Sequence, residues 1–522
     1  MEKNIKITIF SLIVVISAIC IIAVNSNNTS KKTFKKDEIL YALTVDGTSA
    51  TSFPSKGMYK VTVSCENADG KWLYDDWKLS IENVTGDVSC DIDFTTVEKT
   101  YLNNYITSLA GTTQGTGEVV RETAKISDFT NATAISESAY TNQSFFTSNT
   151  FYDTTGGTTI SGTYTFSGTE WKSSYFFSGT LAQNFKFTLS EDGYYELCYT
   201  ISDGDQLFVY INTHFLLKNF GNEVPSSGCI DLGYVTTSDY IRVAKFNNDT
   251  LTFSIKKGTY TTQDAGIRYE GKNPNNYIWF NNEYWRIIGV FDSNTHGQSG
   301  KYLVKIIRAE TLDGLVWNKS YTNDWAAATL NSLLNGAYYN ATDGSSSGYC
   351  YGFSGCETGN CDYTKRGIQS GYRSMIANVT WYLGGYSSSS ATAEAFYGYE
   401  RGTTVYSGRP TSTTGYIGLR YLSDYGYSVL SSSCARTTRL LSYNSSTCAG
   451  ESWLYGKGIE WTITPGSAGD DEVCLVWNDG GVYIEGQTSD GGYSVRPVLY
   501  LDSSVYKIDG DGSLENPFII GM

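Results

Sequence analysis

The sequence predicts a mainly β, multidomain protein in which an N-terminal apolar segment precedes two β-sandwich-like modules and a final α+β module. The composition is the first indication, with 42 Tyr and 53 Gly beside only 7 Pro. Tyr favours half-buried pleated surfaces, and Gly supplies turns between strands. Apolar and polar residues also alternate in short stretches that end at turn residues, which is typical of strands. Finally, 522 residues exceed what one compact core organises, so several domains are expected.

Changes in composition and periodicity divide the chain into six segments. Each segment is assigned by its strand, helix and turn signals rather than by any single residue. We expect an export segment at 1–26, a polar stalk at 27–40, a small β-sandwich at 41–95, a connector at 96–140, a jelly-roll-like β-sandwich at 141–260 and the α+β module at 265–522.

The first residues predict export. Lys3 and Lys6 precede an apolar run at 7–24, which at 18 residues is short for a membrane-spanning helix and long for the core of a signal peptide. Small residues near Ser26 loosely fit a cleavage site. Two outcomes therefore stay open: anchoring at the extracellular face of the membrane through 7–24, or secretion after cleavage near Ser26.

The segment at 41–95 contains two alternating stretches, 59–63 and 77–81, which are typical of strands with one solvated face. Cys65 follows the first stretch, and Cys90 lies before a further strand. A small sandwich clipped by one disulfide is the expected structure. In the connector that follows, we expect a helix over 101–109 and then a loose Gly- and Thr-rich stretch.

The second sandwich shows strands separated by acidic glycine turns. Strands are expected at 185–189, 195–199 and 207–211, and 191–193 reads as the turn between the first two. Alternation of Leu, Phe and Ile over 251–255 would close the module. Such sandwiches bind sugars in some proteins and act as spacers in others.

The final module begins with a predicted hairpin, in which strands at 277–280 and 284–291 flank Asn281-Asn282. A third strand is expected at 302–307. A helix with Trp, Ala and Leu on one face should start after Asn323 or Asp324.

That helix should end at Asn335-Gly336. A shorter helix is expected over 372–377. Strands return as a hairpin, 473–477 with 482–484, and as a last strand over 494–501.

The order of motifs in this module carries a resemblance to a known domain. The motifs are Trp285-Arg-Ile-Ile-Gly289, the Leu-rich helix ending in Asn335-Gly336, the stretch 453–465, the hairpin at 473–484 and Val495-Arg-Pro-Val-Leu-Tyr-Leu501. The order resembles a domain common in surface proteins of anaerobic Gram-positive gut bacteria. It is also similar to the C-type-lectin-like fold shared with formylglycine-generating enzymes.

The resemblance covers about half of the chain and implies two helices on a small irregular sheet, with the strands at 284–291 and 495–501 paired. It does not imply catalysis. Formylglycine-generating enzymes need a close cysteine pair shortly before the last Arg-bearing strand, and here only Cys474 lies near Arg496. With two histidines and no phosphate-binding loop in the chain, we expect no catalytic residues and no enzyme.

The cysteines predict disulfides. Ten of the 11 lie outside the apolar run, and an even number in an exported chain favours disulfides over buried free thiols. No Cys-x-x-Cys pair occurs, so no metal is expected on them. The candidates are Cys65 with Cys90, Cys198 with Cys229, the trio Cys350, Cys356 and Cys361, Cys434 with Cys448, and Cys474, which could pair with one of the trio.

No cofactor is predicted, although one acidic stretch leaves calcium open. Asp509-Gly-Asp-Gly-Ser513, followed by Glu515, provides oxygen ligands but lacks the glycine and glutamate positions of an EF-hand loop. A terminal β-turn explains the same residues more simply.

Aromatic residues in the long loops of the final module are the expected ligand-binding residues. Trp and Tyr stack on sugar rings and anchor protein interfaces, although a core role under irregular loops is the better interpretation for Trp453 and Trp461. The predicted ligand-binding residues are Tyr421, Tyr425, Trp453, Trp461, Trp477 and Asp479.

The net charge of the chain excludes one class of partner. With 38 basic and 53 acidic residues the net charge is −15, which argues against nucleic acid as a partner. The leading hypothesis is a cell-surface adhesin that binds a glycan, a host protein or an envelope protein. The alternatives are a self-assembling envelope component and an extracellular carbohydrate-active enzyme.

Overall fold

A computed structural model describes most of the chain from residue 40 onward. The apolar run at 7–24 and most of the stalk lie outside the described residues. Among the residues that the structure describes, no helix is long and apolar enough to span a membrane. The architecture is mainly β and multidomain, as expected. The described residues are 40–148, 158–159, 164–173, 182–201, 207–212, 214–217, 226–245, 251–352, 360–385, 391–402, 409–456, 458–466, 470–488 and 492–522.

The N-terminal module packs a four-stranded sheet against a two-stranded hairpin. The sheet has the order β2-β1-β6-β3. Its core is aromatic, with the rings of Trp72 and Phe94 packed edge to face at 4.8 Å. The strands are β1 (Leu40–Val45), β2 (Thr48–Ser49), β3 (Tyr59–Glu66), β6 (Ser89–Thr96) and the hairpin β4 (Asp69–Leu73) with β5 (Lys78–Glu82).

The connector is part of the final domain rather than a loose linker. Its predicted helix is present as α1 (Leu102–Ser108), whose Leu102 and Ile106 are buried. The Gly- and Thr-rich stretch after it forms β9 (Thr116–Ala134), which pairs along its length with β20 (Leu251–Asn273). Alternation alone could not show this, because the two strands lie more than 100 residues apart. Shorter strands here are β7 (Thr100–Tyr101) and β8 (Thr112–Gln114).

The second module is a two-layer sandwich inserted between β9 and β20. One sheet has the order β11-β10-β14-β19-β16-β17. Its strands are β10 (Tyr140–Ser148), β11 (Thr158–Thr159), β14 (Ala182–Leu189), β16 (Leu207–Ile211), β17 (His214–Leu217) and β19 (Tyr240–Lys245). The turn after β14 leads into the opposite layer, so the successive strands expected at 185–189 and 195–199 lie in different sheets.

The second layer of the sandwich includes the first part of β20. Phe253 on β20 packs against Phe185 of the other sheet at 5.3 Å between ring centroids. Residues 251–255 therefore complete the sandwich, as expected. This layer contains β12 (Tyr164–Ser167), β13 (Glu170–Ser173), β15 (Gly193–Ile201) and β18 (Ser227–Val235), and the turn η1 (Glu137–Ala139) leads into the module.

The C-terminal domain is built on a sheet with the order β20-β22-β23-β32-β27. The predicted two-residue hairpin is present, because Asn281 and Asn282 both adopt left-handed backbone angles between β21 and β22. The expected direct pairing of 284–291 with 495–501 is not observed, since β23 lies between β22 and β32. The strands are β21 (Tyr277–Phe280), β22 (Glu283–Phe291), β23 (Leu303–Arg308), β27 (Ile417–Gly418) and β32 (Val498–Leu501).

A second sheet of this domain has the order β24-β31-β28-β29-β30, and two small sheets join β25 to β26 and β34 to β33 and β7. The hairpin expected at 473–477 and 482–484 is confirmed as β29 and β30. The strands are β24 (Leu312–Leu315), β25 (Val379–Tyr382), β26 (Ser412–Gly415), β28 (Glu460–Pro465), β29 (Glu472–Val476), β30 (Val482–Gln487), β31 (Tyr493–Val495), β33 (Tyr506–Asp509) and β34 (Ile519–Gly521).

The helix expected after Asp324 is divided into three pieces. Asp324 caps only a 3-10 turn, and Ala328 then takes an extended backbone before the helix resumes. The pieces are η2 (Trp325–Ala327), α3 (Thr329–Leu333) and η3 (Leu334–Tyr338). The remaining helices are α2 (Ser293–His296), η5 (Ser370–Met375) where a helix over 372–377 was expected, α4 (Ala393–Glu400), α5 (Leu422–Gly426), η6 (Leu440–Ser442) and η7 (Ala449–Glu451).

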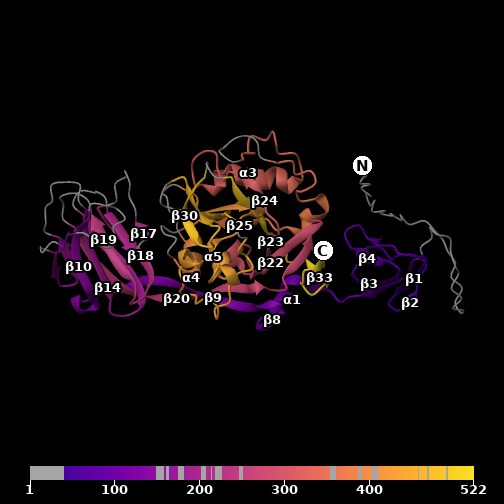
Figure 1. Cartoon of the computed structure of the whole chain (residues 1–522), viewed down its shortest axis with the longest axis horizontal. Coiled ribbons are helices and arrows are strands. Elements are labelled where there is room, and N and C mark those ends of the chain that lie inside the picture. The colour runs from indigo at the N-terminus through magenta and orange to yellow at the C-terminus, as the bar shows by residue number, and fades with distance from the viewer. Residues whose placement is uncertain are drawn as a thin grey trace, which may run out of the picture.

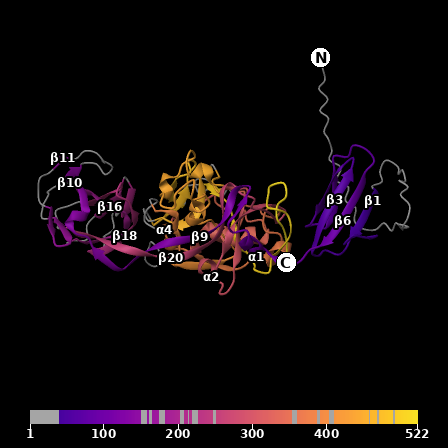
Figure 2. The same cartoon turned by 90° about the horizontal axis from the view of Figure 1, so that it is seen from below.

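The three parts lie in a row, with the C-terminal domain in the middle (Figures 1 and 2). The sandwich lies at one end, joined through the β9–β20 ribbon, and the N-terminal module lies at the other end. The last segment of the chain therefore forms the central part of the molecule.

The described residues contain four disulfides: Cys65–Cys90, Cys198–Cys229, Cys350–Cys361 and Cys434–Cys448. The first two join residues directly opposite each other on paired strands. The suggested pairing of Cys474 with the loop trio is wrong, because Cys474 is buried and free. Cys356 lies outside the described residues.

Candidate functional site

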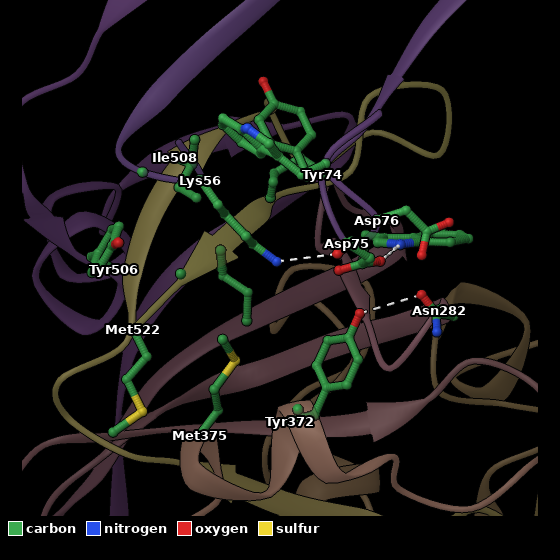
Figure 3. A pocket seen from close by; sticks show the side chains of 17 residues that line it. Lys56, Tyr74, Asp75, Asp76, Asn282, Tyr372, Met375, Tyr506, Ile508 and Met522 are labelled. Carbon is green, nitrogen blue, oxygen red and sulfur yellow. Dashed lines mark hydrogen bonds between the residues drawn. The ribbon is translucent and has the colours of Figure 1, made fainter. Parts of the chain in front are cut away.

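A cavity of about 430 Å³ lies between the N-terminal module and the C-terminal domain (Figure 3). One wall is the turn 74–77 between β4 and β5, and the other is formed by the β21–β22 turn, η5 and the β33–β34 hairpin. Both modules must therefore be in place to form it. The side chains that line the cavity include Lys56, Tyr74, Asp75, Asp76, Trp77, Trp279, Asn282, Tyr372, Met375, Ile508 and Met522.

Asp75 joins the two walls. Its Oδ2 accepts a hydrogen bond of 2.6 Å from the indole Nε1 of Trp279, and its backbone oxygen accepts one of 3.2 Å from Lys56 Nζ. Charged acceptors make stronger hydrogen bonds than neutral ones. The contact holds the acidic turn of the N-terminal module against the C-terminal domain.

Trp77 has an unusual backbone conformation at the end of this turn. Its φ is +51°, in the left-handed region that a bulky residue rarely adopts. The indole Nε1 donates a 2.7 Å hydrogen bond to the backbone oxygen of Pro54, which holds the ring in place. Such conformations persist where surrounding contacts enforce them, and they are frequent at functional sites.

The facing wall is held by amide side chains. Asn281 donates to the backbone oxygen of Gly367 at 3.0 Å and accepts from the backbone N–H of Gln369 at 2.8 Å. Tyr372 donates its hydroxyl to Asn282 Oδ1 at 3.3 Å. The β21–β22 turn and η5 are thereby fixed relative to each other before any ligand binds.

Burial keeps Tyr74 and Tyr372 as neutral hydrogen-bond donors. Burial, followed by the nearby Asp75 carboxylate, raises the pKa of Tyr372. Burial also raises the pKa of Tyr74, whose hydroxyl accepts from the N–H of Val61 and donates to Asp509 at 3.3 Å. Neither phenol ionises near neutral pH.

The pocket combines three kinds of surface. Trp77 and Trp279 supply aromatic rings, and the carboxylates of Asp75 and Asp76 and the amide of Asn282 supply polar groups. Met375, Met522 and Ile508 supply apolar side chains to the pocket (Figure 3). Rings with a few fixed acceptors are suited to a ligand that has both apolar faces and hydroxyl or amide donors.

Four of the six residues predicted to bind a ligand are buried in the core, which corrects that prediction. Each directs its polar atom to a backbone oxygen rather than to solvent. Tyr421 donates to Tyr382, Tyr425 to Gly480, Trp453 to Tyr269 and Trp461 to Leu315. Large aromatic rings fill the space under irregular loops here, the role already open for Trp453 and Trp461.

The other two, Trp477 and Asp479, lie at the β29–β30 hairpin and not at the pocket. Trp477 is half-buried between Tyr483 and Tyr493, with ring centroids at 5.8 and 6.2 Å. Asp479 accepts from the N–H of Gly481 at 2.8 Å, which is a turn contact. Neither Trp477 nor Asp479 lines the cavity between the N-terminal module and the C-terminal domain.

Within the described residues, one group has the composition of a metal site: Glu196, Cys198 and Cys229. The two cysteines form a disulfide, so their sulfurs are not available as thiolate ligands. The acidic stretch near the C-terminus forms a turn, in which Asp511 Oδ1 accepts from the N–H of Ser513 at 2.9 Å.

Sequence reasoning missed the residues that line the pocket. The stretch 74–77 carried a signal, because two adjacent Asp residues come directly before the alternating stretch that begins at Trp77. The Asn281-Asn282 turn was predicted, but nothing local showed that it would face the N-terminal module. Trp279 and Tyr372 have no pattern that separates them from core aromatics.

Comparisons with known proteins gave no match among family models, curated proteins or solved structures. The geometry of the pocket and the residues that line it are therefore the basis for assigning a function.

Proposed function

We propose that this chain is an exported cell-surface adhesin that binds a glycan in the pocket between the N-terminal module and the C-terminal domain. The observation that carries the proposal is the grouping of indole rings with carboxylate and amide groups around one cavity of about 430 Å³. That volume lies within the range of small-ligand sites.

A sugar ring fits this chemistry because it has an apolar C–H face and a rim of hydroxyl groups. The ring of Trp77 packs against the aromatic core of the N-terminal module and also lines the pocket, where an indole can stack on the C–H face of a sugar. The carboxylate of Asp76, which pairs with Lys78 at 2.7 Å, is exposed and able to accept hydroxyl donors. The Tyr372 hydroxyl and Asn282 are held in position by each other. Preformed groups reduce the entropic cost of binding.

Export is supported by two independent features. The apolar run at 7–24 has the character of a signal or anchor, and four disulfides are typical of an oxidising compartment. If residues 7–24 are retained as a membrane anchor, the membrane would lie on the side of the N-terminal module.

As part of this proposal, residues 265–522 have a fold related to that of C-type lectins. In its favour, strands from the start and end of the domain share one sheet through β23, and the helices α3 and α4 accompany that sheet. In such folds irregular loops form the ligand-binding surface, and here the β21–β22 turn and η5 are the irregular segments that line the pocket.

The test is a glycan and mucin array probed with the secreted chain lacking residues 1–26, with calcium and again with chelator. The expected result is saturable binding that D76N and W77A reduce at least about tenfold, a loss of about 1.4 kcal/mol or more. D479N is the matched control, because Asp479 is also an exposed turn carboxylate but lies away from the pocket.

Each other outcome has a distinct meaning. Silence across the array would overturn glycan binding and favour a protein partner. Binding that D76N and W77A leave unchanged would place the glycan elsewhere on the chain. Binding abolished by chelator would assign calcium a role, and shortened glycans after incubation would favour a carbohydrate-active enzyme.

A further inference from the structure

Lys305 and Asp424 meet in the buried interior of the C-terminal domain, and neither residue lines the proposed glycan pocket. Lys305 lies on β23 and Asp424 in the first turn of α5, and Lys305 Nζ is 2.5 Å from Asp424 Oδ2. Lys305 is 0% exposed and Asp424 is 3% exposed. The two residues are 119 positions apart in sequence, so tertiary folding alone brings an amine and a carboxyl into contact.

Aromatic rings surround the amine. The distances from Lys305 Nζ to the ring centroids are 4.4 Å for Tyr421, 5.4 Å for Tyr500 and 5.7 Å for Trp381. Tyr500 is also the cross-strand neighbour of Lys305 on β32. Such an enclosure excludes water, which is both the competitor for hydrogen bonds and the reagent that would hydrolyse an amide.

The carboxyl group is held by donors on both oxygens. Arg268 Nη1 donates to Oδ1 at 3.2 Å, and the backbone N–H of Tyr421 donates to Oδ2 at 3.0 Å. A group attacking the carbon between these oxygens would develop negative charge on Oδ1, facing the Arg268 guanidinium. Fixed donors at that position are what acyl-transfer sites use to stabilise a tetrahedral intermediate.

Two further polar groups at this place have no hydrogen-bond partner among the described residues. They are the Tyr500 hydroxyl and Arg268 Nη2, and both are buried. Unpaired buried donors are uncommon and call for an explanation. An oxygen leaving Asp424 would have donors and an acceptor available in these two groups.

We infer that Lys305 and Asp424 form an intramolecular isopeptide bond, an amide that joins Lys305 Nζ to the side-chain carbon Cγ of Asp424. A proton passes from the Lys305 ammonium to Oδ2, and the free amine attacks Cγ. The C–Oδ2 bond breaks, and Oδ2 leaves as water with the two protons that Nζ has given up. Oδ1 becomes the amide oxygen and stays bonded to Arg268, and no oxidant or second substrate is needed.

Ionisation is compatible with this path. Burial lowers the pKa of Lys305 to about 8, so a useful fraction of the amine is neutral. Burial alone would raise the pKa of Asp424, but Lys305 and Arg268 outweigh it and lower that pKa, so the starting state is an ion pair. The close contact of the two groups offsets the low reactivity of this ion pair, because well-oriented intramolecular groups react with effective concentrations of about 10⁵ to 10⁸ M.

Charge balance favours the product as well. An ion pair and a neutral amide carry the same net charge, so Arg268 keeps the same overall surroundings. The bond replaces two buried charges, each costly to remove from water, by one neutral group that retains its hydrogen bonds. It would tie β23 to α5 in a way that reducing agents do not reverse.

The decisive experiment is mass spectrometry of the reduced, denatured full chain, followed by peptide mapping. The expected mass is lower than that of the sequence by one water, with a branched peptide joining the segments around Lys305 and Asp424. K305R should show neither, since it keeps a cation beside Asp424 without an acylable amine. D424N should still form the branched peptide, now with loss of ammonia.

An unmodified mass for the wild-type chain would overturn the inference and leave a buried ion pair only. Loss of water located elsewhere, such as a succinimide at an Asp-Gly step, would overturn it equally. The wild-type measurement does not depend on whether a variant folds. It is also independent of glycan binding, so failure of either proposal leaves the other intact.

Discussion

The C-terminal domain holds its two neighbouring modules in contrasting ways. The sandwich is joined by two chain crossings, β9 and β20, and by Arg439, which contacts Asp239 at 2.5 and 2.9 Å. The hollow at that junction is only about 10 Å³. The N-terminal module is joined by one crossing near residue 98 and leaves a cavity of about 430 Å³.

The difference shows how a multidomain chain can separate rigidity from ligand access. Two paired strands fix a module's direction, and a filled, charge-paired junction leaves little to rearrange. Tyr399 adds to this by donating its hydroxyl to Asp231 at 2.7 Å. A single crossing with polar contacts such as Asp75–Trp279 leaves room between modules, and the room is where a ligand can enter.

The largest expected effect concerns the sandwich junction. R439M leaves the buried Asp239 without its cation, and we expect a loss of about 4 kcal/mol in the free energy of unfolding of the sandwich. Thermal unfolding and hydrogen exchange across β18 and α4 measure it. R121M, which breaks the exposed Arg121–Asp264 pair, is the control and should cost under about 1 kcal/mol. Equal effects of the two variants would remove the contrast between the junctions.

The next effect should be confined to the N-terminal module. C65S/C90S opens a disulfide that spans 25 residues, and we expect a loss of about 3 kcal/mol, large for so small a core. The module should then unfold at lower temperature than the rest of the chain in calorimetry. C434S/C448S, within the C-terminal domain, should leave that transition unchanged. Simultaneous unfolding of all parts in C65S/C90S would show that the N-terminal junction is tighter than its single crossing suggests.

The sandwich junction should also be sensitive to acid. Burial would raise the pKa of Asp239, but Arg439 and the backbone N–H of Thr236 outweigh it and lower the pKa to about 2. The stability from this pair is therefore present above about pH 4 and is lost as the pH falls toward 2. Unfolding midpoints of the wild type against pH measure the loss. R439M should remove most of it, and an unchanged acid dependence in R439M would contradict the assignment.

The smallest effect belongs to the pocket wall. W279F keeps the ring but removes the donor to Asp75, and we expect docking of the N-terminal module to weaken by about 1 kcal/mol. Protease cleavage of residues 97–99 should rise about fivefold, without a change in the unfolding of either part. W477F, a half-buried Trp away from the junction, is the matched control. Unchanged cleavage in W279F would mean that other contacts hold the module.

Local patterns predicted the elements whose partners lie nearby in sequence. The alternation at 59–63, the Asn281-Asn282 turn and the β29–β30 hairpin all appear as expected, because each depends on neighbouring residues. The pairs Cys65–Cys90 and Cys198–Cys229 were likewise suggested by flanking strands. Four of the six candidate ligand residues proved to be buried, because buried and exposed aromatic residues look alike in sequence and only the tertiary structure separates them.

The sequence by itself determined the mainly β class, the strand and turn positions, and a cysteine set suited to disulfides, since these follow from short-range geometry and residue type. Tertiary structure alone decided that Thr116–Ala134 pairs with Leu251–Asn273 and that the last domain lies in the middle. It also decided that Asp75 meets Trp279 and that Lys305 meets Asp424. Such contacts join residues more than 100 positions apart, and they form because packing buries apolar faces whose partners no local pattern specifies.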